Sequence, residues 1–137
     1  MIEWFADASV LLAGVNTSDR EYNAARSLLG GAAVIATLDL AYYEVTNVAV
    51  RAWRDQAAAR EARGVVSAIA QDGGLVRVDD ALAAAAAELA SQHGLSAYDA
   101  AYVAGAAAAG ARLVSCDMRD LVRPGFAIAP GQAVAAA

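Results

Sequence analysis

The chain has 137 residues, a formal net charge of −5 and a pI of about 4.6, and 59% of its residues are hydrophobic. This length suits a single domain over residues 1–137 with one core. The acidic balance argues against a passive nucleic-acid binder, which would present a basic face. It does not exclude a nuclease, because carboxylates can hold a metal ion that attracts phosphate.

Nothing in the sequence predicts export or membrane insertion. Mean hydropathy is +0.41, but no uncharged stretch reaches the ~18–20 apolar residues that a spanning helix needs. The N-terminus lacks the basic segment of a secretory signal. Cys116 is the one cysteine and cannot form an internal disulfide. The sequence therefore predicts a cytoplasmic protein of a reducing compartment.

Apolar runs and helical patterns alternate along the chain. The runs predict strands at residues 2–6, 33–37, 75–78 and 112–115, with a fifth, edge strand at 126–129. Helices are expected at about residues 8–14, 19–29, 40–53, 56–70, 80–92 and 97–109, followed by a helical turn at 118–122. The tail at 131–137 is expected to be flexible. This alternation predicts a three-layer α/β/α fold around a short parallel sheet of four to five strands.

Capping signals mark several helix boundaries. Ser18 and a glutamate three residues later form a predicted capping box, and Asp39 is the expected cap of the following helix. Asp79 or Asp80 is expected to cap the first of the two helices before the fourth strand, and Ser96 is expected to cap the second. Gly110 is the expected stop of the second of these helices.

Four carboxylates lie in segments that are otherwise apolar: Asp7, Glu44, Asp99 and Asp117. Buried carboxylates need a shared counter-charge, and a hard cation such as Mg²⁺ or Mn²⁺ provides one for a cluster of oxygens. Asp7 and Asp117 follow the first and fourth strands, and Glu44 lies early in the helix after the second. Since function collects at the carboxyl ends of parallel strands, these three suit one edge. Without a metal, their mutual repulsion should raise their pKa values.

The direction of Asp99 is open at this stage, and each acid alone has a simpler explanation. Asp99 lies in the first turn of a helix that begins after a long crossover, where it also reads as part of a capping box with Ser96. Asp7 could simply end a strand, Glu44 could be an exposed helix residue, and Asp117 could cap the turn at 118–122. The alternative function is therefore a non-catalytic α/β interaction module whose acids are helix caps.

Other phosphate and hydrolase chemistries fit poorly. All ten basic residues are arginines. Haloacid-dehalogenase-type phosphatases, response-regulator receivers and Walker-type nucleotide sites all need a lysine, and the phosphatases need a second aspartate where Ser9 stands. His93 is the single histidine and follows a helix that ends at glycine, so it is expected to interact with the helix dipole. The chain also lacks a nucleophile elbow.

Together, four segments resemble the motifs of PIN-domain ribonucleases, in particular the VapC-type toxins of bacterial toxin–antitoxin pairs: DASVLL at 7–12, YEVTN at 43–47, LSAYDAAY at 95–102 and LVSCD at 113–117. The resemblance covers nearly the whole chain. It implies that Asp7, Glu44, Asp99 and Asp117 form an acidic quartet that binds Mg²⁺ or Mn²⁺. It also implies hydrolysis of RNA phosphodiester bonds to 5′-phosphate and 3′-hydroxyl products.

Neighbouring polar residues are candidates for supporting roles. Ser9 and Ser115 could hydrogen-bond a ligand carboxylate or cap local backbone; Ser115 stands where the family usually has threonine. Asn47 could position Glu44 or contact substrate, or be an ordinary helix amide. Asp120 could be an additional carboxylate of the site, although a solvated turn residue is the simpler interpretation.

The resemblance also implies partners. They are an RNA substrate, a VapB-type antitoxin that inhibits the toxin, and a second copy of the chain in a homodimer. Apolar residues of two central helices could form such a surface, although core packing is favoured for most of them: Trp53, Val65, Val66 and Ile69. The sequence does not indicate which RNA is cut, since VapC-type toxins cut transfer RNA, ribosomal RNA or other RNAs.

Overall fold

A parallel four-stranded sheet forms the centre of the protein. The computed structural model describes residues 1–136. The strands are β1 (Trp4–Ala6), β2 (Ile35–Leu38), β3 (Leu75–Val76) and β4 (Arg112–Val114), in the order β3-β2-β1-β4. All three pairings are parallel, so the predicted three-layer fold is confirmed. The expected strand at 126–129 is reduced to one parallel bridge between Val114 and Ile128.

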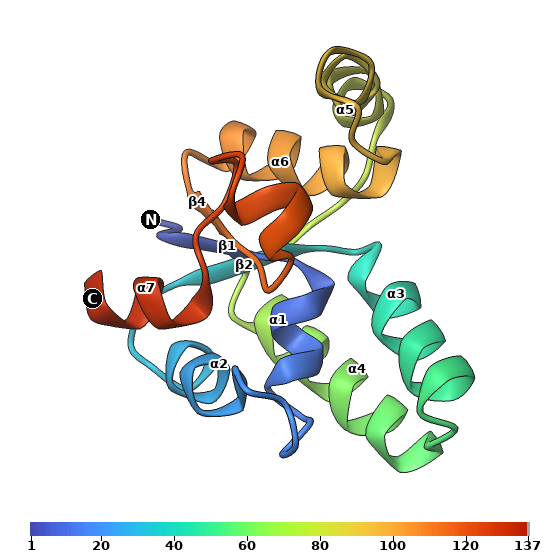
Figure 1. Cartoon of the computed structure of the whole chain (residues 1–137), viewed down its shortest axis with the longest axis vertical. Helices are drawn as coiled ribbons and strands as arrows, with labels where there is room; N and C mark the ends of the chain where they lie inside the picture. Colours follow the sequence, from blue (N-terminus) through green and yellow to red (C-terminus); the bar gives the residue numbers. More distant parts are fainter. Residues whose placement is uncertain (137) are drawn as a thin grey trace.

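Helices cover both faces of the sheet (Figure 1). One face carries α1 (Ala8–Ala13), α2 (Tyr22–Leu29) and α4 (Gln56–Gln71), and the other carries α5 (Asp80–His93) and α6 (Ala97–Ala109). At the end of the sheet, α3 (Ala41–Asn47) continues into the π-helix η1 (Val48–Ala52). A second π-helix, η2 (Met118–Val122), follows β4. None of the helices within residues 1–136 combines the length and apolar character that a bilayer span requires.

Residues 130–136 form a helix where the sequence predicts a flexible tail at 131–137; residue 137 lies outside the described residues. Helix α7 spans Pro130–Ala136 and packs against α2. Pro130 and Ala133 are buried, and Ala133 belongs to the core on that face. Contact with a distant helix therefore orders a segment whose own composition predicts fraying.

Side chains of the central strand alternate between the two halves of the core. Trp4 and Ala6 face the half beneath α1, α2 and α4, whereas Phe5 faces the half beneath α5 and α6. Strand geometry causes this alternation, since successive side chains point to opposite faces. A strand buried on both faces reads as a continuous apolar run, which is the pattern that predicts it.

The strand order creates one switch point, which is the place where the direction of winding along the sheet reverses. From β1 the chain moves outward to β2 and β3 through helices on one face. It then returns through α5 and α6 on the opposite face to place β4 on the other side of β1. In open parallel sheets, ligands bind outside the carboxyl ends of the strands where the direction of winding reverses. That position here lies after Ala6 and Val114.

Two of the predicted caps are wrong and the others are confirmed. Helix α2 begins at Tyr22, and the Asp19 carboxylate accepts the Glu21 N–H at 2.8 Å, which displaces the Ser18 capping box. The Asp39 carboxylate accepts the Val78 N–H at 3.2 Å and joins two separate segments, so it does not cap α3. By contrast, each expected cap residue or stop of α5 and α6 is found: Asp79, Ser96 and Gly110.

Core packing is the main role of the apolar residues proposed for a partner surface. Val66 and Ile69 are buried, and Trp53 and Val65 pack against the same core cluster. These side chains therefore stabilise the contact of α4 with the sheet face and offer little free surface.

Close contact of α6 with the sheet depends on Gly105. A Cβ atom there would lie 2.9 Å from Phe5 Cζ and 3.1 Å from Leu38 Cδ2. Both of those side chains are fully buried, so neither can move freely. Gly64, in the middle of α4, has no atom within 4 Å of the same added carbon. The two glycines form a matched pair for testing the packing.

We predict opposite effects for the two alanine substitutions. Gly105→Ala should lower the free energy of unfolding by about 1 kcal/mol, because overpacking costs about 1–3 kcal/mol and helix propensity returns about 1. Gly64→Ala should raise it by about 1 kcal/mol, since only propensity acts. Chemical denaturation of both variants measures the difference. Equal stabilisation by both substitutions would show that α6 is not packed as described.

Candidate metal centre

Asp7 is a buried carboxylate directly after β1. It is 5% exposed and forms the N-cap of α1, where its Oδ1 accepts the Val10 N–H at 3.3 Å and the Ser9 hydroxyl at 2.5 Å. Its backbone N–H donates to the Val114 carbonyl of β4 at 3.2 Å. Asp7 is therefore held at the switch point both through its side chain and through the sheet.

Two serines join the loop after β4 to Asp7. Ser9 Oγ accepts the Cys116 N–H at 2.8 Å and lies 3.4 Å from Ser115 Oγ. Ser115 is buried, and its Oγ accepts the Asp117 N–H at 3.0 Å. Both supporting roles expected for these serines occur together, since Ser9 donates to a carboxylate while Ser115 caps backbone. The two hydroxyls set the position of Asp117 relative to Asp7.

Three carboxylates from α6 and η2 lie close together. Oxygen atoms of Asp99, Asp117 and Asp120 are all within 4.8 Å of one another. Asp117 also caps η2, where its Oδ1 accepts the Asp120 N–H at 2.9 Å. Asp99 has its own N–H capped by Ser96 at 3.0 Å. The start of α6 therefore directs Asp99 to the same sheet edge as Asp117, and Asp120 joins them.

The Glu44 carboxylate is held by Tyr102, a residue that the sequence did not indicate as functional. The Tyr102 hydroxyl donates to Glu44 Oε1 at 2.7 Å, and Tyr102 itself is only 2% exposed. Tyr102 lies one helical turn after Asp99, on the same side of α6. That i, i+3 spacing was the available signal, because side chains three apart on a helix are neighbours.

Burial is the main cause of the raised pKa values in this cluster. The pKa of Asp7 is raised to about 6, mainly by loss of solvent; hydrogen bonds from Ser115, Ser9 and Val10 lower it in part, and the charge of Asp99 contributes the smallest increase. Burial and then the Asp99 charge raise the pKa of Glu44. Burial raises the pKa of Asp99 most, and the charges of Asp117 and Asp120 raise it further. The sequence predicted mutual repulsion as the cause, and repulsion is the smaller contribution.

Asn47 and Arg51 lie beside this cluster and do not enter it. Both are exposed and line a cavity of about 640 Å³ that also contains Glu44. Asp7 and Glu44 also lie outside the group of three acids whose oxygens are within 4.8 Å of one another. The charge of Asp99 nevertheless raises the pKa of both residues.

The sequence matches the PIN domain family over residues 4–126. The chain belongs to this family. Members of the PIN domain family are nucleases that use divalent metals. The match spans all four segments that carry the acidic quartet. A search of curated proteins found no match.

Solved structures with the same fold cover almost the whole PIN domain. A protein of Pyrobaculum aerophilum is 26% identical, with a TM-score of 0.72 over 98% of this chain and 96% of that one. A toxin–antitoxin complex from Klebsiella pneumoniae is 16% identical, with a TM-score of 0.70 over 93% and 98%. VapC20 of Mycobacterium tuberculosis, a toxin that cleaves the sarcin-ricin loop, is 23% identical, with a TM-score of 0.71 over 90% and 96%. The likeness shows that the chain has the fold of these proteins.

The donor set of this PIN domain fits a hard divalent cation. The clustered groups are all carboxylates, and oxygen ligands are those that Mg²⁺ and Mn²⁺ prefer. Among the described residues, the one ion pair in the cluster is the exposed contact of Arg119 Nε with Asp120 Oδ1 at 3.7 Å. Surface pairs of this kind stabilise weakly. The buried acids thus lack a strong counter-charge of their own.

We predict that Asp7→Asn stabilises the metal-free protein at neutral pH. Because the pKa of Asp7 is about 6 in the folded chain against a usual value of 3.8, the folded state binds more protons between these values. Stability therefore falls as pH rises from about 4 to 6 and stays lower above that. The full effect is at most about 3 kcal/mol. An asparagine oxygen can still accept from Ser9 and Val10.

Denaturant unfolding of both proteins in EDTA at pH 4 and pH 7 measures this effect. The gain of Asp7→Asn should appear at pH 7 and vanish near pH 4. Asp72→Asn is the control, since Asp72 is exposed at the end of α4. A variant at Asp7 that is less stable than the parent at pH 7 would contradict the prediction.

Proposed function

We propose that this protein is a VapC-type toxin, an endoribonuclease that hydrolyses RNA phosphodiester bonds with Mg²⁺ or Mn²⁺. The observation that carries the proposal is the close approach of Asp99, Asp117 and Asp120 at the sheet edge of a PIN fold. Asp7 and Glu44 lie near enough for the charge of Asp99 to raise their pKa values. Burial of unneutralised acids destabilises the fold, and a metal ion offsets that cost while attracting a phosphate. Fold, family and the clustered charges all support a catalytic centre, rather than a set of acids that only cap helices.

The proposed ligand set is Asp7, Glu44, Asp99 and Asp117, with Asp120 as an additional carboxylate. The chemistry that a bound ion supplies is activation of water and neutralisation of negative charge on the phosphoryl oxygens. Ser9 and Ser115 would keep Asp7 and Asp117 at a constant separation. Tyr102 would hold the Glu44 carboxylate toward the centre through its hydroxyl. Such partners orient ligands and tune their basicity.

The proposed partners follow from the same fold relation. Similar structures include VapBC complexes from Rickettsia felis and Salmonella typhimurium, each bound to DNA. We infer that a VapB-type antitoxin inhibits this chain, that the toxin forms a homodimer, and that it acts in the cytoplasm.

The alternative, an interaction module whose acids are caps, receives partial support. Asp7 and Asp117 do cap α1 and η2. Glu44 and Asp99 are not explained in this way, because the Glu44 carboxylate bonds to Tyr102 and the Asp99 carboxylate lies against two other acids. Capping therefore accounts for half of the quartet, whereas the proposed metal binding would account for all of it.

A metal-dependent gain in stability tests the site without reference to activity. At a free Mn²⁺ concentration about 100 times the Kd, binding to the folded state alone should add about 2.7 kcal/mol to the free energy of unfolding. Thermal melts with Mn²⁺ and with EDTA measure the shift. Asp99→Asn should lose most of the shift, whereas Asp72→Asn should keep it. Identical melts with and without the ion would reject the metal site.

Cleavage assays test the activity directly. Purified protein should cut RNA with Mg²⁺ or Mn²⁺ and stop with EDTA. Asp7→Asn and Asp99→Asn should each lower the rate roughly 100-fold or more, because a metal centre contributes several kcal/mol to the transition state. Circular dichroism checks that the variants stay folded. Variants that still cleave at the parent rate would leave the interaction module as the better explanation.

A further inference from the structure

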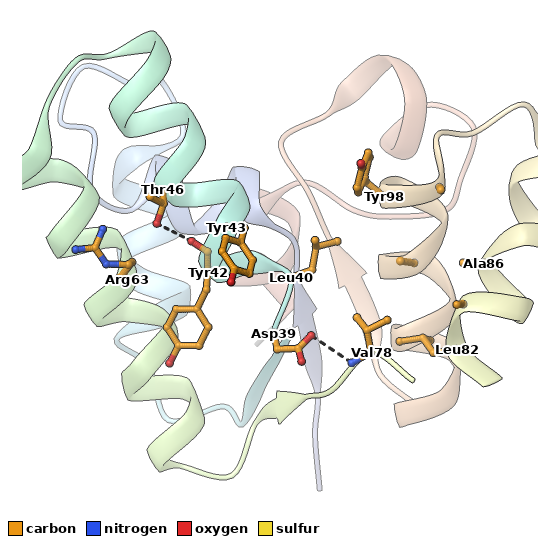
Figure 2. A pocket seen from close by; sticks show the side chains of 13 residues that line it. Asp39, Leu40, Tyr42, Tyr43, Thr46, Arg63, Val78, Leu82, Ala86 and Tyr98 are labelled. Carbon is orange, nitrogen blue, oxygen red and sulfur yellow. Dashed lines mark hydrogen bonds between the residues drawn. The ribbon is translucent and has the colours of Figure 1, made fainter. Parts of the chain in front are cut away.

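A large groove opens beside the carboxylate cluster. It contains a cavity of about 900 Å³, with α3 and α4 on one side and α5 and α6 on the other (Figure 2). Its apolar lining includes Leu40, Leu82 and Ala86. The cavity that holds Glu44, of about 640 Å³, shares several of its lining residues: Leu40, Tyr43, Thr46 and Tyr98. The two cavities are therefore neighbouring parts of one groove that leads to the proposed active site. Ligand sites in proteins typically measure about 300–1,000 Å³.

Two exposed tyrosines border this groove from opposite sides. Tyr43 lies on α3 and is 80% exposed, and Tyr98 lies on α6 and is 61% exposed. Figure 2 shows their rings on either side of Leu40. Each tyrosine directly precedes an acid of the quartet, Glu44 or Asp99. Large exposed aromatic rings are unfavourable in water, and their position at the rim of a site indicates a ligand that covers them.

The groove contains two arginines that can contact phosphate and two acids, of which Glu44 belongs to the proposed metal site. Arg51 is exposed and lines the same cavity as Glu44, and Arg63 lines the larger cavity. The carboxylate of Asp39, also in the larger cavity, is engaged by the Val78 N–H. Aromatic rings that line the same cavities as arginines, next to the proposed metal centre, match the way proteins bind single strands, by stacking bases and contacting phosphates.

We propose that Tyr43 and Tyr98 stack an unpaired base of the RNA strand whose backbone crosses the carboxylate cluster, and that Arg51 contacts a phosphate of the same strand. The inference rests on the proposed ribonuclease function and assigns residues of this chain that contact a base and a phosphate beside that site. Bases in a duplex are already stacked on one another and would have to be splayed out first. The tyrosines would thereby select an unpaired segment for cleavage.

Equilibrium binding measurements distinguish what a base contributes to RNA affinity from what a phosphate contributes. Fluorescence anisotropy in EDTA, which stops cleavage, compares three probes of equal length: an unstructured RNA oligonucleotide, its duplex, and an abasic ribose-phosphate oligomer. Tyr43→Ala and Tyr98→Ala should each weaken binding of the single strand roughly 5- to 150-fold, the range measured for loss of one stacked base. Neither should change binding of the abasic oligomer. Tyr43→Phe and Tyr98→Phe keep the ring and should stay within about twofold of the parent.

Two further variants serve as matched controls. Arg51→Gln should weaken binding of the single strand and the abasic oligomer alike, because a phosphate contact is independent of the base. Tyr22→Ala should change neither, since Tyr22 lies on α2 beside Arg26, away from the groove. Equal losses of the alanine variants on RNA and on the abasic oligomer, or no loss on RNA, would overturn the stacking proposal.

The outcome is independent of whether the protein cleaves. Metal-dependent cleavage with no effect of the tyrosines on binding would overturn the stacking proposal and leave the ribonuclease intact. Base-dependent binding without cleavage would support stacking and reject the nuclease. Alanine variants that alter the sedimentation of the protein, or its complex with an antitoxin, without base-dependent RNA binding would assign the groove to a protein partner and overturn the proposal.

Discussion

The parallel pairing of β4 with β1 is the contact on which the site depends. It places Ala6 opposite Val114, so the two strands end side by side, and Asp7 donates its N–H to the Val114 carbonyl. The serine contacts beyond the strands continue this pairing into the loops. Asp7 and Asp117, more than one hundred residues apart in sequence, are thereby placed at the same edge of the sheet, where the direction of winding reverses.

Burial gives this edge its chemical character. The Asp7 carboxylate accepts hydrogen bonds and still has a raised pKa, because the loss of water outweighs the stabilisation by neutral donors. The same acids cap helices, so the residues that could bind metal also define where α1 and η2 begin. Stability without metal and affinity for metal are therefore opposed at these positions. Functional sites commonly depart in this way from the rules that favour stability.

Helix α6 connects the carboxylates to the groove. Its first turn carries Tyr98 and Asp99, and its second carries Tyr102, which holds Glu44 on α3. Close packing against Phe5 through Gly105 sets the depth at which the helix lies on the sheet. The position of one helix on one strand thus determines both the separation of the acids and the width of the groove beside them.

The sequence by itself determined the element types and the register of the acidic motifs, because these depend on local periodicity and on residue chemistry. It predicted the three-layer parallel fold and the caps of α5 and α6, which are confirmed, and the four acids as one metal-binding set, which stays a prediction. It left open the direction of Asp99 and favoured a solvated role for Asp120. It also missed the Tyr102–Glu44 bond, the helix at Pro130–Ala136 and the true role of Asp39. These features were decided by the tertiary structure, since each depends on contacts between segments far apart in the chain, which only the strand order and helix packing specify.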